Sequence, residues 1–95
     1  MKEVYATIYT KENGKEEFTY SEWQKKAPLD RTYHRLDGPS AVFNTDAGVH
    51  VKNIFWDIEG ESFTKEEYNQ LIREVRDMPL VLRLIDPRKW VREYK

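Results

Sequence analysis

The sequence predicts a single α+β domain over residues 1–95. We expect a meander-like antiparallel sheet of about four to six strands, covered by one main helix from the C-terminal half and joined by two short helices. Two observations carry this prediction. Alternating β-branched and aromatic segments are separated by turns that contain glycine. The strongest helical pattern follows those segments, with apolar residues at i, i+3, i+4 and i+7.

The strands are predicted from alternation and from turn residues. Val4–Thr10 alternates, and the Asn13-Gly14 pair that follows favours a tight hairpin because both residues tolerate positive φ. Glu16–Phe18 is then the returning strand. The remaining predicted strands are Thr32–Leu36, Ala41–Asn44, Val49–Ile58 and Leu80–Ile85.

Two helix starts share one pattern, Phe-Thr-x-x-Glu followed by an aromatic residue, at residues 18–23 and 63–68. In each, the threonine is a predicted N-cap, and the glutamate three positions later completes a capping box. Either two helices begin with the same general capping chemistry, or a hairpin-plus-helix unit is duplicated. Both explanations stay open at this point.

The main helix is predicted to begin after Thr64 and to end before Pro79. Tyr68, Leu71 and Val75 belong to its apolar face. A short terminal helix is expected after Asp86-Pro87, because aspartate caps helices and proline suits the first helical turn. Its apolar residues, facing the body of the protein, are Trp90, Val91 and Tyr94.

Composition excludes several classes of function. The chain has no cysteine, which excludes disulfides, thiolate metal sites and a cysteine nucleophile. Its net charge of −1 is too balanced for a protein that depends on many phosphate contacts. The N-terminus lacks the apolar segment of a signal peptide, so we expect a cytoplasmic protein. No metal, cofactor, small-molecule ligand or membrane contact is expected.

The histidines are the only candidates for acid–base chemistry. His34 and His50 could together cleave RNA, which defines a small nuclease as one alternative function. Neither histidine has a recognisable metal-ligand spacing with a nearby carboxylate. Both are interpreted as surface or hairpin-flanking residues, and no catalytic residue is predicted.

Charge is distributed unevenly along the chain. Residues 57–67 are rich in acidic side chains, and residues 73–95 are mildly basic. Charged surface clusters steer partners of opposite charge. The predicted binding residues are Glu59, Glu61, Arg88, Lys89, Trp90 and Arg92.

A tight turn is predicted at Asp37, Gly38 and Pro39. Aspartate accepts backbone hydrogen bonds in turns, glycine permits positive φ, and proline stiffens the exit. The turn is therefore interpreted as structural.

Residues 33–72 resemble small uncharacterised phage and bacterial proteins that carry a His-Arg-x-Asp-Gly-Pro-Ala hairpin, a tryptophan strand and a capped helix. The matching segments are "YHRLDGPSAV", "FWDIEG" and "SFTKEEYNQL", with Ser40 where alanine is usual and Glu59 where asparagine is usual. In longer relatives the segment repeats somewhat like MORN repeats, whereas it occurs once here. The resemblance implies a hairpin packed on a helix and a phage origin, and it implies no enzymatic activity.

The leading hypothesis is therefore a small, non-enzymatic, cytoplasmic binding protein, a phage accessory factor that engages a host or phage protein. A nucleic-acid-binding protein that uses the basic C-terminus is the second alternative.

Overall fold

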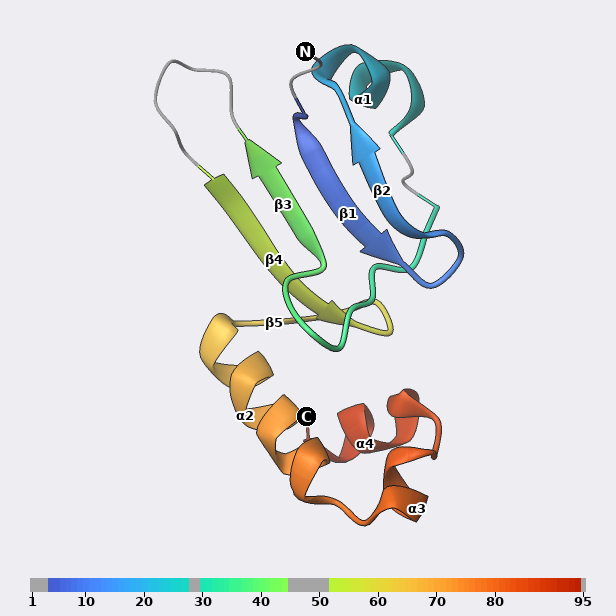
Figure 1. Cartoon of the computed structure of the whole chain (residues 1–95), viewed down its shortest axis with the longest axis vertical. Helices are drawn as coiled ribbons and strands as arrows, with labels where there is room; N and C mark the ends of the chain where they lie inside the picture. The colour runs from blue at the N-terminus through green and yellow to red at the C-terminus, as the bar shows by residue number, and fades with distance from the viewer. Residues whose placement is uncertain (1–3, 28–29, 45–51, 95) are drawn as a thin grey trace.

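The structure is a computed structural model that describes residues 4–27, 30–44 and 52–94. It confirms the predicted α+β fold, with a five-stranded antiparallel sheet in the order β2-β1-β3-β4-β5 (Figure 1). The strands are β1 (Ala6–Thr10), β2 (Gly14–Phe18), β3 (Ala41–Asn44), β4 (Lys52–Ile58) and β5 (Glu61–Phe63). The helices are α1 (Tyr20–Lys26), α2 (Lys65–Asp77), α3 (Leu80–Arg83) and α4 (Pro87–Tyr94).

β3 lies at the centre of the sheet, between two hairpins. β1 and β2 form the hairpin on one side, and β4 and β5 form the hairpin on the other. Each hairpin leads into a helix, α1 after β2 and α2 after β5. The sheet is therefore a meander interrupted once, since the chain passes from β2 at one edge to β3 in the middle.

The two hairpin helices begin with the same capping box. In α1 and α2 the threonine N-cap, Thr19 or Thr64, accepts a hydrogen bond from the backbone of the glutamate three positions later. The glutamate side chain, Glu22 or Glu67, accepts one from the threonine N–H in return. Both predicted boxes are confirmed, so local sequence alone sets where these helices begin.

The two helices contact the sheet from opposite faces. Trp23 of α1 packs edge-on against Phe43, whose ladder partner in β1 is Ala6. On the other side, Tyr68 of α2 contacts Trp56, with ring centroids 5.0 Å apart. Phe43 and Phe55 share a face, and Trp56, the next residue in β4, points to the other because side chains alternate along a strand.

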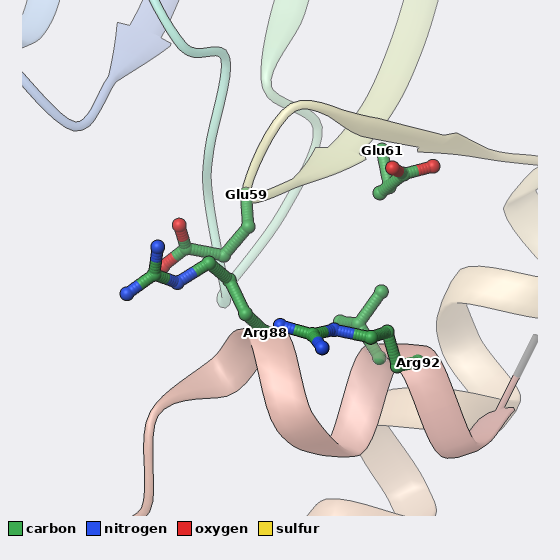
Figure 2. A pocket seen from close by; sticks show the side chains of 5 residues that line it. Glu59, Glu61, Arg88 and Arg92 are labelled. Atoms are coloured by element: carbon green, nitrogen blue, oxygen red, sulfur yellow. The ribbon is translucent and has the colours of Figure 1, made fainter.

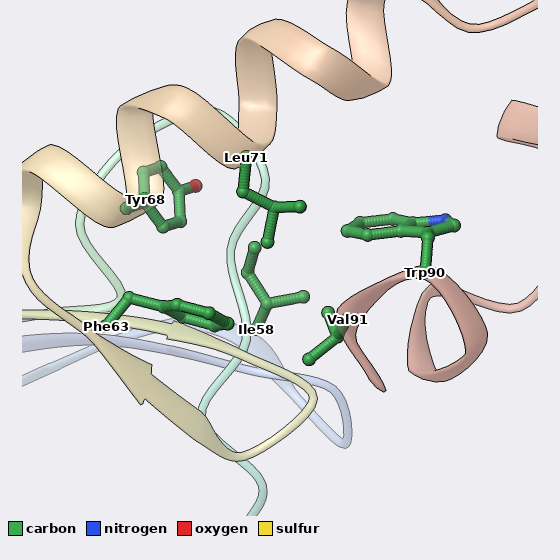
Figure 3. Close-up of a cluster of buried hydrophobic side chains, with 6 residues drawn as sticks. All are labelled: Ile58, Phe63, Tyr68, Leu71, Trp90 and Val91. Atoms are coloured by element: carbon green, nitrogen blue, oxygen red, sulfur yellow. The ribbon is translucent and has the colours of Figure 1, made fainter. Parts of the chain in front are cut away.

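The main hydrophobic core joins α2 and α4 to the β4–β5 hairpin (Figure 3). Trp90 and Val91 of α4 are buried in it, and Tyr94 packs against it, as the apolar spacing of the terminal helix predicted. The buried members of this core are Ile58, Phe63, Tyr68, Leu71, Trp90 and Val91.

Two predicted strands are wrong. Leu80–Ile85 is not a strand, since Leu80–Arg83 form α3 and Leu84 N–H donates back to Leu80 C=O. The chain leaves α2 at the end of the molecule away from the sheet, so no strand edge is available there (Figure 1). Thr32–Leu36 is also not a strand, apart from one isolated bridge between Tyr33 and Thr10.

The segment around Tyr33 is instead a connection that crosses the end of the sheet. His34 N–H donates to Tyr9 C=O on the β1 side. Arg35 N–H donates to Asp57 C=O, and Tyr33 C=O accepts from Gly60 N–H, both on the β4–β5 side. The connection thus ties the two hairpins together where β3 begins. The predicted start of the β4 strand at Val49 lies outside the described residues.

Candidate functional site: a charged cleft at the β4–β5 turn

The turn between β4 and β5 has an uncommon backbone. Glu59 and Gly60 both have positive φ, at 52° and 80°. A two-residue turn with positive φ at both central positions matches the twist of a hairpin. Glycine adopts this conformation without strain, but a glutamate there is disfavoured. Neighbouring groups must therefore stabilise Glu59.

His34 and Lys11 supply that stabilisation. His34 Nδ1 accepts a hydrogen bond of 3.0 Å from Glu59 N–H, and Lys11 Nζ lies 2.8 Å from Glu59 Oε2. The Glu59 side chain is only 6% exposed, so this ion pair is partly shielded from water. Of the two predicted roles of His34, the hairpin-flanking one fits and the surface one does not, because His34 is partly buried and accepts a hydrogen bond from the turn of the β4–β5 hairpin. Burial lowers the pKa of His34 below its usual value, while the charge of Glu59 partly opposes this.

We expect folding stability to decrease as the pH falls below about 6.5, partly because of His34. Its pKa is lowered in the folded protein, so the unfolded chain takes up the proton first. The contribution of neutral His34 is therefore complete above the unfolded pKa and is lost as the pH falls toward the folded pKa. Urea midpoints at about pH 8 and about pH 5.5 should differ more for the wild type than for His34→Asn. Asparagine retains an acceptor oxygen but does not titrate, so equal differences would contradict this role of His34.

The same turn forms one wall of a cleft, and α4 forms the other (Figure 2). The cleft has a volume of about 340 Å³. Its lining residues are Glu59, Glu61, Arg88, Val91 and Arg92. Four of the six predicted binding residues therefore meet in one place, although the acidic and basic clusters are far apart in the sequence.

Most charges around the cleft are already paired. Asp86, just before α4, accepts from Arg88 N–H at 3.0 Å and binds the Arg88 guanidinium, with Nη2 2.6 Å from Oδ2. The hydrogen bond from the Arg88 side chain lowers the pKa of Asp86 to about 2. Arg92 forms no ion pair within the described part of the chain. The cleft therefore combines mutually compensating charges with one guanidinium open to a ligand.

Lys89 and Trp90 do not belong to the cleft. Lys89 is exposed on α4 but does not line it. Trp90 is buried in the core, so its proposed role as a contact residue is wrong and its ring cannot stack on a ligand. Its indole N–H has no hydrogen-bond partner within the described residues.

The predicted turn at Asp37, Gly38 and Pro39 is organised around Arg35. The Arg35 guanidinium lies 3.8 Å from the centroid of the Tyr9 ring, and its Nε is 2.9 Å from Asp37 Oδ1. Its Nη1 donates to Pro39 C=O. The predicted positive φ at Gly38 is wrong. A Cβ at position 38 would lie 2.9 Å from Arg35 Cζ, so a larger residue there requires the Arg35 guanidinium to shift.

Sequence reasoning placed Asp57 in the exposed acidic cluster, but it is buried with only 5% exposure. Ser40 Oγ donates to Asp57 Oδ2, and Ser62 Oγ donates to Oδ1 at 2.6 Å. Buried carboxylates need such donors. In the sequence, the burial of Asp57 could have been suspected only from the serines at positions 40 and 62. Their pairing with Asp57 depends on strand register, which the sequence does not show.

The described residues give no further support to a metal site, a nuclease site or a membrane-spanning helix. No group of three or more histidine, aspartate or glutamate side chains there could hold a metal ion. His50, the second histidine of the predicted nuclease site, lies outside the described residues. Within the described segments, no helix has both the length and the apolar character needed to cross a bilayer.

Comparison with protein-family models, with curated proteins and with solved structures found no match. The resemblance of residues 33–72 to small phage proteins therefore stays a prediction.

Proposed function

We propose that this chain is a small, non-enzymatic binding protein that engages a protein partner through the charged cleft between the β4–β5 turn and α4. One observation carries the proposal, the convergence of Glu59 and Glu61 with Arg88 and Arg92 around one open cleft. Charges of both signs at an interface select the partner and fix its orientation. Arg92 is the residue that we expect to receive a carboxylate of the partner.

This arrangement supports a protein partner better than a nucleic acid. Binding to phosphates requires cations that are not already neutralised. Arg88 is paired with Asp86, and Glu59 and Glu61 line the same cleft as Arg92. The nuclease alternative has less support, because the Nδ1 atom of His34 is occupied by a backbone N–H. We place the partner in a bacterial cell or its phage on the resemblance of residues 33–72.

We expect Arg92→Glu to weaken partner binding and Lys89→Glu to preserve it. Both residues are exposed basic residues on α4, but only Arg92 lines the cleft. Tagged full-length chains should be used to capture proteins from bacterial lysate, with quantitative mass spectrometry of the captured proteins. With the purified partner, the association rate should fall about tenfold in Arg92→Glu and less at high salt.

Equal binding by the two variants would contradict a role for the cleft. A mobility shift of DNA or RNA by the wild type that weakens with salt would instead favour the nucleic-acid alternative. Circular dichroism of both variants checks that the fold is retained.

A further inference from the structure

One wall of the cleft depends on the imidazole of His34. Glu59 lines the cleft with a φ of 52°, and its N–H donates to His34 Nδ1 over 3.0 Å. A glutamate in this left-handed conformation is disfavoured and persists only where its surroundings hold it. The bond to His34 is therefore part of what places Glu59 at the cleft, although His34 itself does not line it.

The backbone around this imidazole is anchored on both sides. His34 N–H donates to Tyr9 C=O of β1. The carbonyl of the preceding residue, Tyr33, accepts from Gly60 N–H of the turn. His34 and Gly60 are thus both held by the backbone, and a change at the imidazole acts on the peptide between these anchors, that of Glu59.

The bond from Glu59 exists only while His34 is neutral. A neutral imidazole has one donor nitrogen and one acceptor nitrogen, whereas the protonated ring donates from both. Because Glu59 supplies an N–H, Nδ1 of His34 is the acceptor and Nε2 carries the proton. Protonation places a second hydrogen on Nδ1, directly opposite the Glu59 N–H. Two donors then face each other, and the hydrogen bond is lost.

The charges around the ring come from three parts of the fold. Burial lowers the pKa of His34, the charge of Glu59 opposes this, and the charge of Lys11, directly after β1, adds to it. Lys11 Nζ lies 2.8 Å from Glu59 Oε2. On the α4 side of the cleft, the pKa of Arg88 is raised by its hydrogen bond to Asp86 and, less strongly, by Glu59 (Figure 2). A charged His34 therefore competes with Lys11 and Arg88 for one carboxylate.

We propose that His34 is a positioning residue of the cleft, and that its protonation releases the Glu59 peptide, so that the cleft wall is complete only while His34 is neutral. The consequence, weaker partner binding at mildly acidic pH, rests on the proposed function. The release itself is a property of the free chain and can be measured without a partner.

Nuclear magnetic resonance of the labelled full-length chain tests the release, from about pH 8 down to the pH at which the His34 ring is fully protonated. The ring carbon shifts of His34 give its titration midpoint. The scalar coupling across the hydrogen bond, between the amide nitrogen of Glu59 and His34 Nδ1, should be present at high pH and be lost with that midpoint. The Glu59 N–H should then exchange faster with solvent.

A coupling that is absent at high pH, or that persists once His34 is protonated, would overturn the proposal. The bond from Tyr5 N–H to Phe18 C=O, at the other end of β1, reports on the fold as a whole and should remain. Its loss together with that of the Glu59 bond would show global unfolding and would also contradict a local release.

His34→Asn is the matched control, because asparagine keeps an acceptor oxygen and does not titrate. The Glu59 amide shift should depend on pH in the wild type and not in this variant. His50 is present in both chains, so it cannot account for the difference. An equal pH dependence in the two chains would contradict the role of His34.

Lys11→Met provides a second test that keeps the histidine. Removing the Lys11 charge should raise the midpoint of His34, because that charge lowers its pKa. The loss of the Glu59 bond should move to the same higher pH. A Glu59 change that stays at the wild-type pH would show that another group controls it.

The release and the proposed function fail separately. Equal partner binding by Arg92→Glu and Lys89→Glu would reject the cleft as the binding site and leave the release intact. A Glu59 amide that is insensitive to pH would reject the release and leave the role of Arg92 untouched. With the purified partner, protonation of His34 should raise the dissociation constant at least about fivefold in the wild type, the lower end of usual coupling between sites, and not in His34→Asn. Equal rises in both chains would overturn the regulatory consequence.

Discussion

Replacing Trp90 by alanine should lower the free energy of unfolding by about 3–5 kcal/mol, the usual effect of truncating a buried tryptophan. Trp90 and Val91 are the buried residues of α4, and Trp90 packs in the core with Leu71 (Figure 3). Without the indole ring, α4 loses most of its contact with the core, and Arg88 and Arg92 lose their fixed positions at the cleft. Urea unfolding followed by circular dichroism measures the change without relying on the fluorescence of the remaining tryptophans.

Trp90→Phe is the informative companion variant. The buried indole N–H has no hydrogen-bond partner within the described residues, and an unpaired buried donor is itself destabilising. Phenylalanine removes that donor while it keeps most of the apolar ring. We therefore expect less than half of the loss seen for alanine. A cost below about 1 kcal/mol for Trp90→Ala would contradict the docking of α4 through this residue.

Asp57→Ala should lower the free energy of unfolding by about 3 kcal/mol, because hydrogen bonds to a charged group contribute about 1.5–3 kcal/mol each. Asp57 is buried and accepts from the hydroxyl groups of Ser40 and Ser62. These bonds join the start of β3 to the β4–β5 hairpin. Equilibrium urea denaturation at neutral pH provides the measurement.

A double-mutant cycle separates the hydrogen bond from simple loss of volume. Asp57→Ala combined with Ser40→Ala should cost less than the sum of the single changes, because no polar partner is left unpaired between these two positions. Asp37→Ala is the matched control, since the Asp37 side chain is 86% exposed and its loss should have little effect. Additive costs, or equal effects at positions 37 and 57, would contradict a buried network.

The parts of the fold that the sequence predicts well are those set by neighbouring residues. Thr19 with Glu22 and Thr64 with Glu67 begin their helices as expected, because a capping box involves only four positions. The apolar spacing of α2 and α4 predicted which residues are buried. Asn13-Gly14 predicted the first hairpin correctly but not its turn, because Gly14, with a φ of 67°, is the first residue of β2 and pairs with Thr10, and Asn13 has no positive φ.

The predictions that were wrong concern features that depend on neighbours in space and not on neighbours in the sequence. An apolar run such as Leu80–Ile85 is compatible with a strand or a helix, and only the absence of a neighbouring sheet edge decides between them. The exposure of its side chains is equally invisible in the sequence, because apolar residues normally predict burial. The positive φ predicted for Gly38 is also wrong, and its close approach to the Arg35 guanidinium is a tertiary feature that the sequence does not show.

The candidate site was predicted in its residues but not in its arrangement. Glu59, Glu61, Arg88 and Arg92 were selected as charged surface residues, and their meeting at one cleft depends on how α4 packs. Trp90 was also selected as a binding residue but is buried, and this too depends on how α4 packs. An amphipathic helix buries one face and exposes the basic residues beside it. The structural role of His34 could not be seen, since it depends on the unusual backbone of Glu59.

The central position of β3 has a consequence for the order of folding. Each outer hairpin is made by residues close in sequence, which can pair within microseconds. β3 is also close in sequence to β4, with which it pairs, so the non-local pairing in the sheet is that of β3 with β1. Closing long loops limits folding rates when non-local contacts dominate. The β1–β2 hairpin and the β3–β4–β5 strands can thus form early as separate units, and the pairing of β3 with β1 is the step that makes them one cooperative domain.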